Sequence, residues 1–441
     1  MSEPFAPPPN PTPTVAEGLH PYLDAPWRGE SSAGPMSPLT ADPEDGEEAS
    51  GPVVQFIDRV LETALARGAS DIHFEPCPDG YRVRLRLDGV LRTVARPPAE
   101  QAPRLAARLK VLARLDISER RLPQDGRLRT TLGDGATLDA RVATLPTLAG
   151  EKVVLRLVDP LTHHPDIDSL GMEPEQQRLL LAALERSQGL ILVTGPTGSG
   201  KTLTLYTALA RLNDDRRNIA TAEDPAEVAL PGVNQVTIQP RAGLDFATVL
   251  RAFLRQDPDV IMVGEMRDAE TAGIAIKAAQ TGHLVLSTLH TADAPRSLAR
   301  LQSMGVAAHN IATSVSLIIA QRLVRRLCPR CARPRVWQPA ELAAAGHEGL
   351  GDQPLTLHEP VGCDHCHEGY RGRLALFQVM PFSAEMARLV LAGGDSLALA
   401  EQAQREGVAS LYRMGLARAA AGLTSLVEVE RATREFGHDP L

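Results

Sequence analysis

The chain has 441 residues, of which 43% are hydrophobic and 23% charged, an ordinary composition for a globular protein of two or three domains. Its net charge is −8, but residues 1–50 hold nine acids and one base, so residues 51–441 carry 45 acidic and 45 basic side chains. A body with balanced charge and 3% aromatic residues argues against a dedicated nucleic-acid-binding surface.

The first 50 residues predict a disordered, acidic leader. They contain 11 prolines and the cluster "DPEDGEEAS", and show little periodic hydrophobicity. A plain spacer and a short partner-binding segment over residues 19–27 are both consistent with this composition. We read neither a signal peptide nor a run of about 18–20 apolar residues. We therefore expect a cytoplasmic protein whose thiols stay reduced.

Residues 51–160 predict a small α+β domain. Apolar residues recur at helical spacing over residues 53–70 and again over 99–116. Runs typical of strands occupy the segments between and after these helices, namely residues 71–76, 80–94, 126–132, 136–146 and 151–159.

Residues 161–325 have a different pattern. Helical segments alternate with short, almost wholly apolar runs, at residues 190–194, 218–222, 260–264 and 284–289. Continuous apolar strands between helices are typical of a parallel sheet covered on both faces. A helical region over residues 383–441 ends the chain.

A phosphate-binding loop follows the first of these apolar strands. The string "GPTGSGKT" matches G-x-x-x-x-G-K-[ST] and precedes a helical segment, which is the context the motif requires. Glycines allow backbone N–H groups to surround phosphates, while Lys201 would reach the β- and γ-phosphates and Thr202 would ligate Mg²⁺. The predicted nucleotide-binding residues are Gly195, Pro196, Thr197, Gly198, Ser199, Gly200, Lys201 and Thr202.

Acids and histidines follow the other apolar strands. Glu265 comes directly after residues 260–264 and is our candidate for polarising the attacking water. The string "TAEDPAE" supplies Glu223, Asp224 and Glu227 after another strand. His283 and His290 flank the strand at residues 284–289. A structural role, γ-phosphate sensing and binding of Mg²⁺ waters all fit them.

Four of the five cysteines form two C-x-x-C pairs. Cys328 and Cys331 form the first pair, and Cys363 and Cys366 form the second, with 31 residues between the pairs. We place both pairs in one small subdomain at residues 326–382. Four thiolates provide the closed tetrahedral shell of a structural zinc site. A thioredoxin-type redox pair would need only one such unit, and chance pairing of four cysteines is disfavoured. Cys77 stands alone.

Seven strings together resemble the secretion ATPase superfamily, in particular the GspE and PilB type of type II secretion and type IV pilus assembly motors. They are "GASDIHFEP", "RLPQDGRL", "GEKVVLRL", "GPTGSGKTLTLY", "AEDPAE", "LRQDPDVIMVGEMRD" and "TGHLVLSTLHTADAP". The similarity covers about residues 53–435. It implies an α/β fold in which a RecA-like P-loop ATPase domain follows a small PAS-like α+β domain and precedes a zinc subdomain.

The resemblance also implies catalytic roles. Glu265 would be the catalytic acid, Glu223 a second essential acid and His290 the key histidine. Arg141 and Arg156 of the small domain would contact ATP, with Arg127 as a weaker candidate. The cofactors implied are ATP, Mg²⁺ and Zn²⁺.

As partners, the resemblance implies five further copies in a homohexamer and inner-membrane platform proteins, which would hold the motor at the membrane. Nothing indicates direct contact with nucleic acid. A hexameric nucleic-acid motor, a non-hydrolysing scaffold and a pilus retraction motor remain alternatives, the last disfavoured by the cysteines. Members of the superfamily usually carry a further N-terminal domain, which residues 1–50 cannot form.

Overall fold

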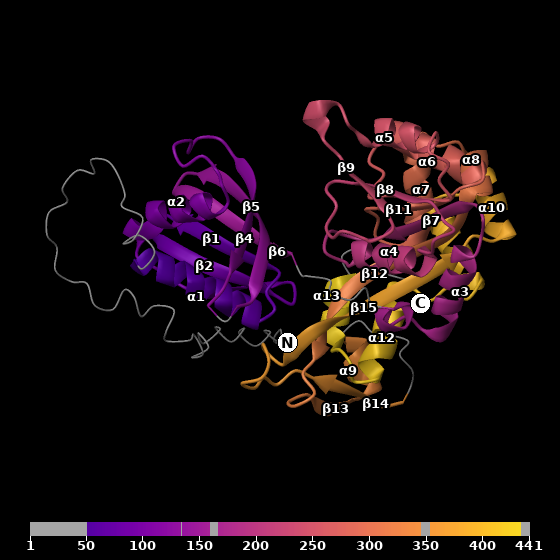
Figure 1. Cartoon of the computed structure of the whole chain (residues 1–441). Helices are drawn as coiled ribbons and strands as arrows, with labels where there is room; N and C mark the ends of the chain where they lie inside the picture. Colours follow the sequence, from indigo (N-terminus) through magenta and orange to yellow (C-terminus); the bar gives the residue numbers. More distant parts are fainter. Residues whose placement is uncertain (1–50, 134, 159–165, 345–352, 434–441) are drawn as a thin grey trace, which may run out of the picture. The chain divides into compact units, whose positions relative to one another are not determined.

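The computed structural model describes residues 51–133, 135–158, 166–344 and 353–433. The leader predicted over residues 1–50, with its candidate partner-binding segment, lies outside these ranges. The chain divides into two compact units, residues 1–160 and 161–441, and each is described by itself (Figure 1). Among the described helices, none has both the length and the apolar character required to cross a membrane.

The first unit is a six-stranded antiparallel sheet with two helices. The strand order is β3-β2-β1-β6-β5-β4. Side chains from α1 and α2, such as Phe56 and Leu105, pack against inward-facing residues of β1 and β2, such as Ile72 and Leu85. The elements are α1 (Pro52–Ala66), β1 (Asp71–Cys77), β2 (Gly80–Leu87), β3 (Val90–Ala95), η3 (Ala99–Gln101), α2 (Ala102–Leu112), β4 (Gln124–Thr131), β5 (Thr137–Thr147) and β6 (Gly150–Val158).

The strand predicted over residues 80–94 is two strands. Asp88 and Gly89 both have positive φ, 49° and 87°, and form the two-residue turn between β2 and β3. Asp-Gly is a favoured pair for this hairpin turn, because both central positions need a left-handed backbone. The alternating apolar pattern continues on both sides of the turn, which explains why the single-strand interpretation was wrong.

The second unit is built on a seven-stranded sheet with the order β15-β12-β7-β11-β10-β8-β9. All neighbours are parallel except β12 and β15, which pair antiparallel. Its strands are β7 (Gly189–Thr194), β8 (Ile219–Glu223), β9 (Asn234–Thr237), β10 (Val260–Val263), β11 (Leu284–Leu289), β12 (Val315–Leu327) and β15 (Tyr370–Pro381), while β13 (Arg333–Trp337) and β14 (Leu355–Glu359) form a separate pair.

Helices cover both faces of this sheet (Figure 1). One apolar core includes residues of α5, α6, α7, α8, α10 and α11, and the other includes residues of α3 and α4. The helical elements are η4 (Ile167–Leu170), α3 (Pro174–Leu184), α4 (Lys201–Leu212), η5 (Pro240–Ala242), α5 (Phe246–Phe253), α6 (Ala269–Gln280), α7 (Ala294–Ser303), α8 (Ala308–Ser314), α9 (Pro339–Ala344), α10 (Ala384–Leu391), α11 (Ser396–Arg405), α12 (Leu411–Ala420) and α13 (Leu426–Thr433).

The cysteine-bearing segment is an insertion between two strands of the main sheet. It leaves the sheet after β12 and returns to it at β15. The subdomain predicted at residues 326–382 thus includes β15, which pairs with β12 from Leu317 to Leu327. A third, smaller core joins Leu342 and Leu357 of the insertion to Ala419 and Val429 of the last two helices.

Candidate functional site

The candidate catalytic residues of the second unit lie at one edge of its sheet. Strands β7, β11, β10 and β8 are adjacent and parallel, so their carboxyl ends share that edge. The phosphate loop follows β7, Glu223 ends β8, Glu265 follows β10 and His290 follows β11. Ligands of open parallel sheets bind beyond the carboxyl ends of the strands.

The phosphate loop is backed by strand β12. A Cβ atom on Gly195 would lie 2.4 Å from the Gln321 carbonyl oxygen, and one on Gly200 would lie 2.8 Å from Gln321 Nε2. Both glycines also have positive φ, so no other residue fits there without strain. Gln321 accepts a hydrogen bond from Thr204 Oγ1 at 2.8 Å, which joins β12 to helix α4. Sequence reasoning missed Gln321, because nothing local marks it as a neighbour of the phosphate loop.

Lys201 is the first residue of α4 and points back into the loop. Its ammonium donates to the carbonyl oxygens of Gly195 at 2.9 Å and Pro196 at 3.0 Å. Burial lowers the pKa of Lys201 to about 8, opposed by the nearby charge of Glu265. Thr202 is exposed at the same helix start. This arrangement presents a lysine, a hydroxyl and a helix N-terminus to one place, as phosphate binding requires.

Glu265 is held between a histidine and an arginine. His290 Nε2 lies 3.4 Å from Glu265 Oε2, and Arg267 forms an ion pair and hydrogen bond with Glu265 Oε1. The hydrogen bond from Arg267 keeps the pKa of Glu265 below its ordinary value. Arg267 also lies 3.9 Å from Asp224 Oδ2, so it spans the ends of β10 and β8. Sequence reasoning missed Arg267, although it stands two residues after Glu265.

The other candidate histidine is separated from this group. His283 precedes β11, and its Nδ1 lies 3.0 Å from the Ala278 carbonyl oxygen. His290 follows the same strand, so the two rings lie at opposite edges of the sheet, on the order of 20 Å apart. The hypothesis that both histidines serve one nucleotide site is therefore wrong for His283.

Glu223 is buried and linked to the phosphate-loop helix. Its Oε1 accepts hydrogen bonds from Thr221 Oγ1 at 2.6 Å and Gln235 Nε2 at 3.0 Å, while Oε2 accepts one from the Tyr206 hydroxyl. Burial and the Glu223 hydrogen bond raise the pKa of Tyr206. Since Tyr206 belongs to α4, Glu223 ties β8 to the helix that begins at Lys201. The sequence did not indicate this connection.

Arg141 and Arg156 belong to the first unit, where they are direct register partners on β5 and β6. Arg127 pairs with Arg141 from the next strand. Arg156 Nε donates to Asp71 Oδ1 at 3.1 Å. The sheet thus gathers the three arginines on adjacent strands, and their action on a nucleotide stays a prediction.

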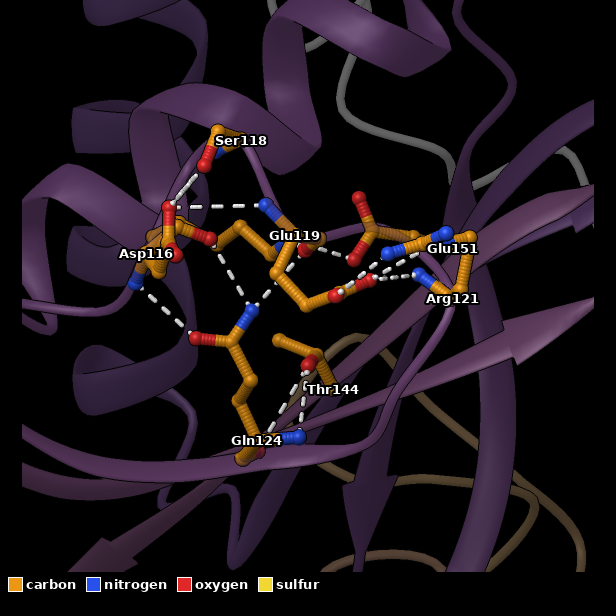
Figure 2. Close-up of polar contacts among 8 residues, drawn as sticks. Asp116, Ser118, Glu119, Arg121, Gln124, Thr144 and Glu151 are labelled. Carbon is orange, nitrogen blue, oxygen red and sulfur yellow. Dashed lines mark hydrogen bonds and ion pairs between the residues drawn. The ribbon is translucent and has the colours of Figure 1, made fainter.

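The start of β4 and the segment before it, over which the "RLPQDGRL" string extends, are fixed by polar contacts (Figure 2). Gln124 Nε2 donates to the carbonyl oxygens of Asp116 and Glu119, each at 2.9 Å. The buried Lys110 donates to the Glu119 carbonyl oxygen at 2.6 Å and pairs with Glu151 at 2.5 Å. A Cβ atom on Gly126 would lie 2.7 Å from the Ala113 carbonyl oxygen. These contacts anchor the start of the strand that carries Arg127.

The four cysteines of the two C-x-x-C units converge on one point. Their Sγ atoms all lie within 4.8 Å of one another, with 3.9 Å between Cys328 and Cys363 and 3.6 Å between Cys331 and Cys366. A tetrahedral Zn–S₄ site with bonds of about 2.3 Å has S···S separations of about 3.8 Å. The donor set and its spacing therefore fit a zinc ion, and Cys77 takes no part.

Strand β12, which leads into the first cysteine pair, is joined to the C-terminal helix α13 by a buried ionic contact. Glu428 of α13 is fully buried and pairs with Arg325 of β12 at 2.7 Å and with Arg431 at 2.8 Å. Arg325 also lies over the Tyr370 ring, 4.0 Å from its centre. Although burial opposes ionisation, hydrogen bonds from these arginines lower the pKa of Glu428 to about 2. Sequence reasoning missed this contact.

The sheet covered by helices on both faces, the phosphate loop and the Glu265–His290 pair define a P-loop protein of the RecA-like ATPase class. Residues 46–431 match the family model described as "Type II/IV secretion system protein", and the chain belongs to that family. The family and fold-class predictions are thereby confirmed.

Curated relatives agree with this assignment. The chain is 53% identical over 386 residues to the type IV pilus assembly ATPase PilB of Acinetobacter baylyi, covering 87% of this chain and 67% of the relative. It is 45% identical over 392 residues to type II secretion system protein E of Dickeya dadantii, covering 89% and 77%.

Solved structures support the fold. The Legionella pneumophila ATPase DotB aligns with a TM-score of 0.62 at 22% identity, covering 86% of this chain and 95% of that one. The pilus retraction motor PilT with bound ADP aligns with a TM-score of 0.54 at 24% identity, covering 85% and 96%. Both are similar to this chain in architecture.

Proposed function

We propose that the chain is a Mg²⁺-dependent ATPase that powers assembly of a type IV pilus or of a type II secretion pseudopilus. The observation that carries this proposal is the meeting of the phosphate loop and the Glu265–His290 pair at one sheet edge. Curated relatives at 45–53% identity are named as the corresponding assembly and secretion proteins.

In this proposal the phosphate loop binds the nucleotide. The Lys201 ammonium moves from the loop carbonyls to the β- and γ-phosphate oxygens, and the helix N-terminus adds positive potential. Thr202 would hold Mg²⁺, which neutralises charge on the phosphate oxygens. Pro196, Thr197 and Gly198 form the exposed turn of the loop.

Hydrolysis is assigned to the acids and the histidine. Glu265 orients the attacking water and accepts its proton, while His290 fixes the carboxylate and, being half-exposed, can contact the γ-phosphate. Glu223 acts through α4, because its carboxylate contacts Tyr206. Arg141 and Arg156 stabilise the negative charge that develops on the transferred phosphoryl group.

The cysteine cluster would hold a structural Zn²⁺ ion through Cys328, Cys331, Cys363 and Cys366. Bound there, the ion would crosslink the two ends of the insertion that leaves the sheet at β12 and returns at β15. The motor would act as a homohexamer on inner-membrane platform proteins, which would place it at the cytoplasmic side of that membrane.

Phosphate release from the full-length chain tests this function. We expect turnover with Mg²⁺ and ATP, loss of turnover with EDTA, and at least about a hundredfold loss in Lys201→Ala. Added DNA should leave the rate unchanged, whereas a DNA-stimulated and steeply salt-dependent rate would favour a nucleic-acid motor. A strain from which the gene for this chain has been deleted should regain pili or secretion when the chain is supplied again. Failure to regain them would contradict the assembly role.

A further inference from the structure

One transverse row of the small sheet is almost entirely arginine. The antiparallel registers place one residue of each of five adjacent strands side by side. In order from β4 to β2 these are Arg127, Arg141, Arg156, Asp71 and Arg86. Their chain neighbours Leu128, Ala140, Leu155, Ile72 and Leu85 belong to the buried core, so the row lies on the face opposite α1 and α2.

The charges in this row differ from those usual in cross-strand pairs, where like charges directly opposite one another are avoided. Arg127 faces Arg141, and Arg141 faces Arg156, with Cβ atoms of such pairs about 4.5–5.5 Å apart. Like charges directly opposite one another destabilise a sheet. A row of four arginines and one aspartate is therefore a cost to folding, and such costs are concentrated at functional sites.

Asp71 is the one acid in the row, and it contacts the arginine on each side of it. Its Oδ1 accepts from Arg156 Nε at 3.1 Å, and its Oδ2 lies 3.4 Å from Arg86 Nε. Ser70 Oγ donates to Oδ2 at 2.9 Å. The Asp71 side chain is 9% exposed, whereas that of Arg156 is 62% exposed. A buried, fixed carboxylate thus holds a solvent-facing guanidinium.

The atom used in this contact decides what Arg156 can still do. Asp71 holds Arg156 through Nε, at the base of the guanidinium group. Within the described part of the chain this is the one hydrogen bond that Arg156 makes, and 62% of its side chain is exposed, which leaves its two terminal amino groups available. Those two groups form the planar fork that binds phosphate oxygens in pairs.

We propose that Asp71 is a positioning residue for the ATPase reaction, which aims the terminal amino groups of Arg156 at phosphate. The inference rests on the proposed function, in which Arg156 contacts the nucleotide. Holding Arg156 in one orientation lowers the entropy lost when it engages the transition state. Asp71 itself touches no substrate.

A matched control lies on the same strand and the same face. Glu75 is also a buried carboxylate, and it pairs with Arg82 at 2.8 Å, Arg84 at 2.8 Å and Lys152 at 2.9 Å. Glu75 lies outside the arginine row and has no contact with Arg156 among the described residues. We therefore expect it to contribute to the stability of the sheet and not to the ATPase reaction. Glu75→Gln therefore reports what losing a buried counter-charge does to this unit.

The test is a double-mutant cycle on the full-length chain, with phosphate release measured against ATP concentration and melting measured in parallel. Asp71→Asn should lower kcat/KM about tenfold in the native background and have no effect in an Arg156→Ala background. Asp71→Glu should recover part of the loss. Glu75→Gln should lower the melting temperature and leave kcat/KM within about twofold. If Asp71→Asn does not fold, Asp71→Glu carries the same comparison in both backgrounds.

The outcomes separate this inference from the function on which it rests. An Arg156→Ala variant with normal turnover would overturn both the nucleotide role of Arg156 and the positioning role of Asp71. Reduced turnover in Arg156→Ala with unchanged turnover in Asp71→Asn would overturn the positioning role alone. Equal losses from Asp71→Asn in both backgrounds would also overturn it, because Asp71 would then act by another route.

Discussion

His290 Nε2 lies 3.4 Å from Glu265 Oε2, at the ends of two adjacent strands of the main sheet. With Arg267 on the other carboxylate oxygen, the two side chains fix the orientation of the proposed catalytic acid. His290 is half-exposed, whereas only 18% of the Glu265 side chain is exposed.

Removing the His290 ring should impair hydrolysis more than binding. In His290→Ala we expect kcat to fall by about 10²-fold, a typical loss for a group that helps proton transfer, with little change in KM because Lys201 is untouched. His283→Ala is the matched control, since His283 directly precedes the same strand at its opposite end. This variant should retain normal kcat. A larger loss of kcat in His283→Ala than in His290→Ala would contradict the placement of the site at the carboxyl ends of the strands.

The hydroxyl of Tyr206 should contribute to stability through Glu223. Tyr206→Phe deprives the buried Glu223 carboxylate of one donor, and we expect a loss of about 1–3 kcal/mol in the free energy of unfolding. Tyr81→Phe is the control, because the buried Tyr81 hydroxyl has no hydrogen-bond partner among the described residues. Urea unfolding should show little change or a small gain for Tyr81→Phe, and equal losses would refute the assignment.

Acid should weaken the contact between α13 and β12. The pKa of Glu428 is about 2 in the folded chain and near 4.5 ordinarily, so its contribution is complete above pH 4.5 and disappears as the pH falls towards 2. We expect Glu428→Gln to cost about 3 kcal/mol at pH 7 and progressively less below pH 4.5.

Thermal melting of both proteins from pH 7 to pH 3 measures this difference. Glu175→Gln removes an exposed carboxylate paired with Arg178 and should change the melting temperature little at any pH. A Glu428→Gln penalty that stays constant down to pH 3 would contradict the pairing.

The cysteine cluster predicts a stoichiometric metal site. The purified chain should contain one Zn²⁺ per subunit, and a thiol reagent should modify Cys77 alone until a chelator exposes the other four cysteines. Cys328→Ser should lose zinc and become sensitive to proteolysis within the insertion, whereas Cys77→Ser should keep both properties. Five reactive thiols before chelation would refute the zinc site.

Much of the fold could be read from the sequence because its signals are local. The phosphate loop, the four apolar strands of the main sheet and the two C-x-x-C units each lie within a short stretch of chain. The edge of the sheet at which Glu265 and His290 meet follows from the parallel order of those strands.

The remaining features depend on register between distant segments. Nothing local indicates that Asp71 faces Arg156 from 85 positions away, or that Glu428 meets Arg325 from 103 positions away. Arg325 lies on β12, which pairs antiparallel with β15, and sequence analysis predicted neither strand. Such contacts are fixed by strand pairing and burial, which a single sequence does not specify.

Nucleotide binding and phosphate release, measured together on Glu265→Gln and Lys201→Ala, test the central claim most directly. Glu265→Gln should bind ATP with near-native affinity and release phosphate at least about 10²-fold more slowly, because it keeps the loop and loses the base. Lys201→Ala should lose both properties. Normal phosphate release from Glu265→Gln would show that hydrolysis takes place without Glu265 and would contradict the account.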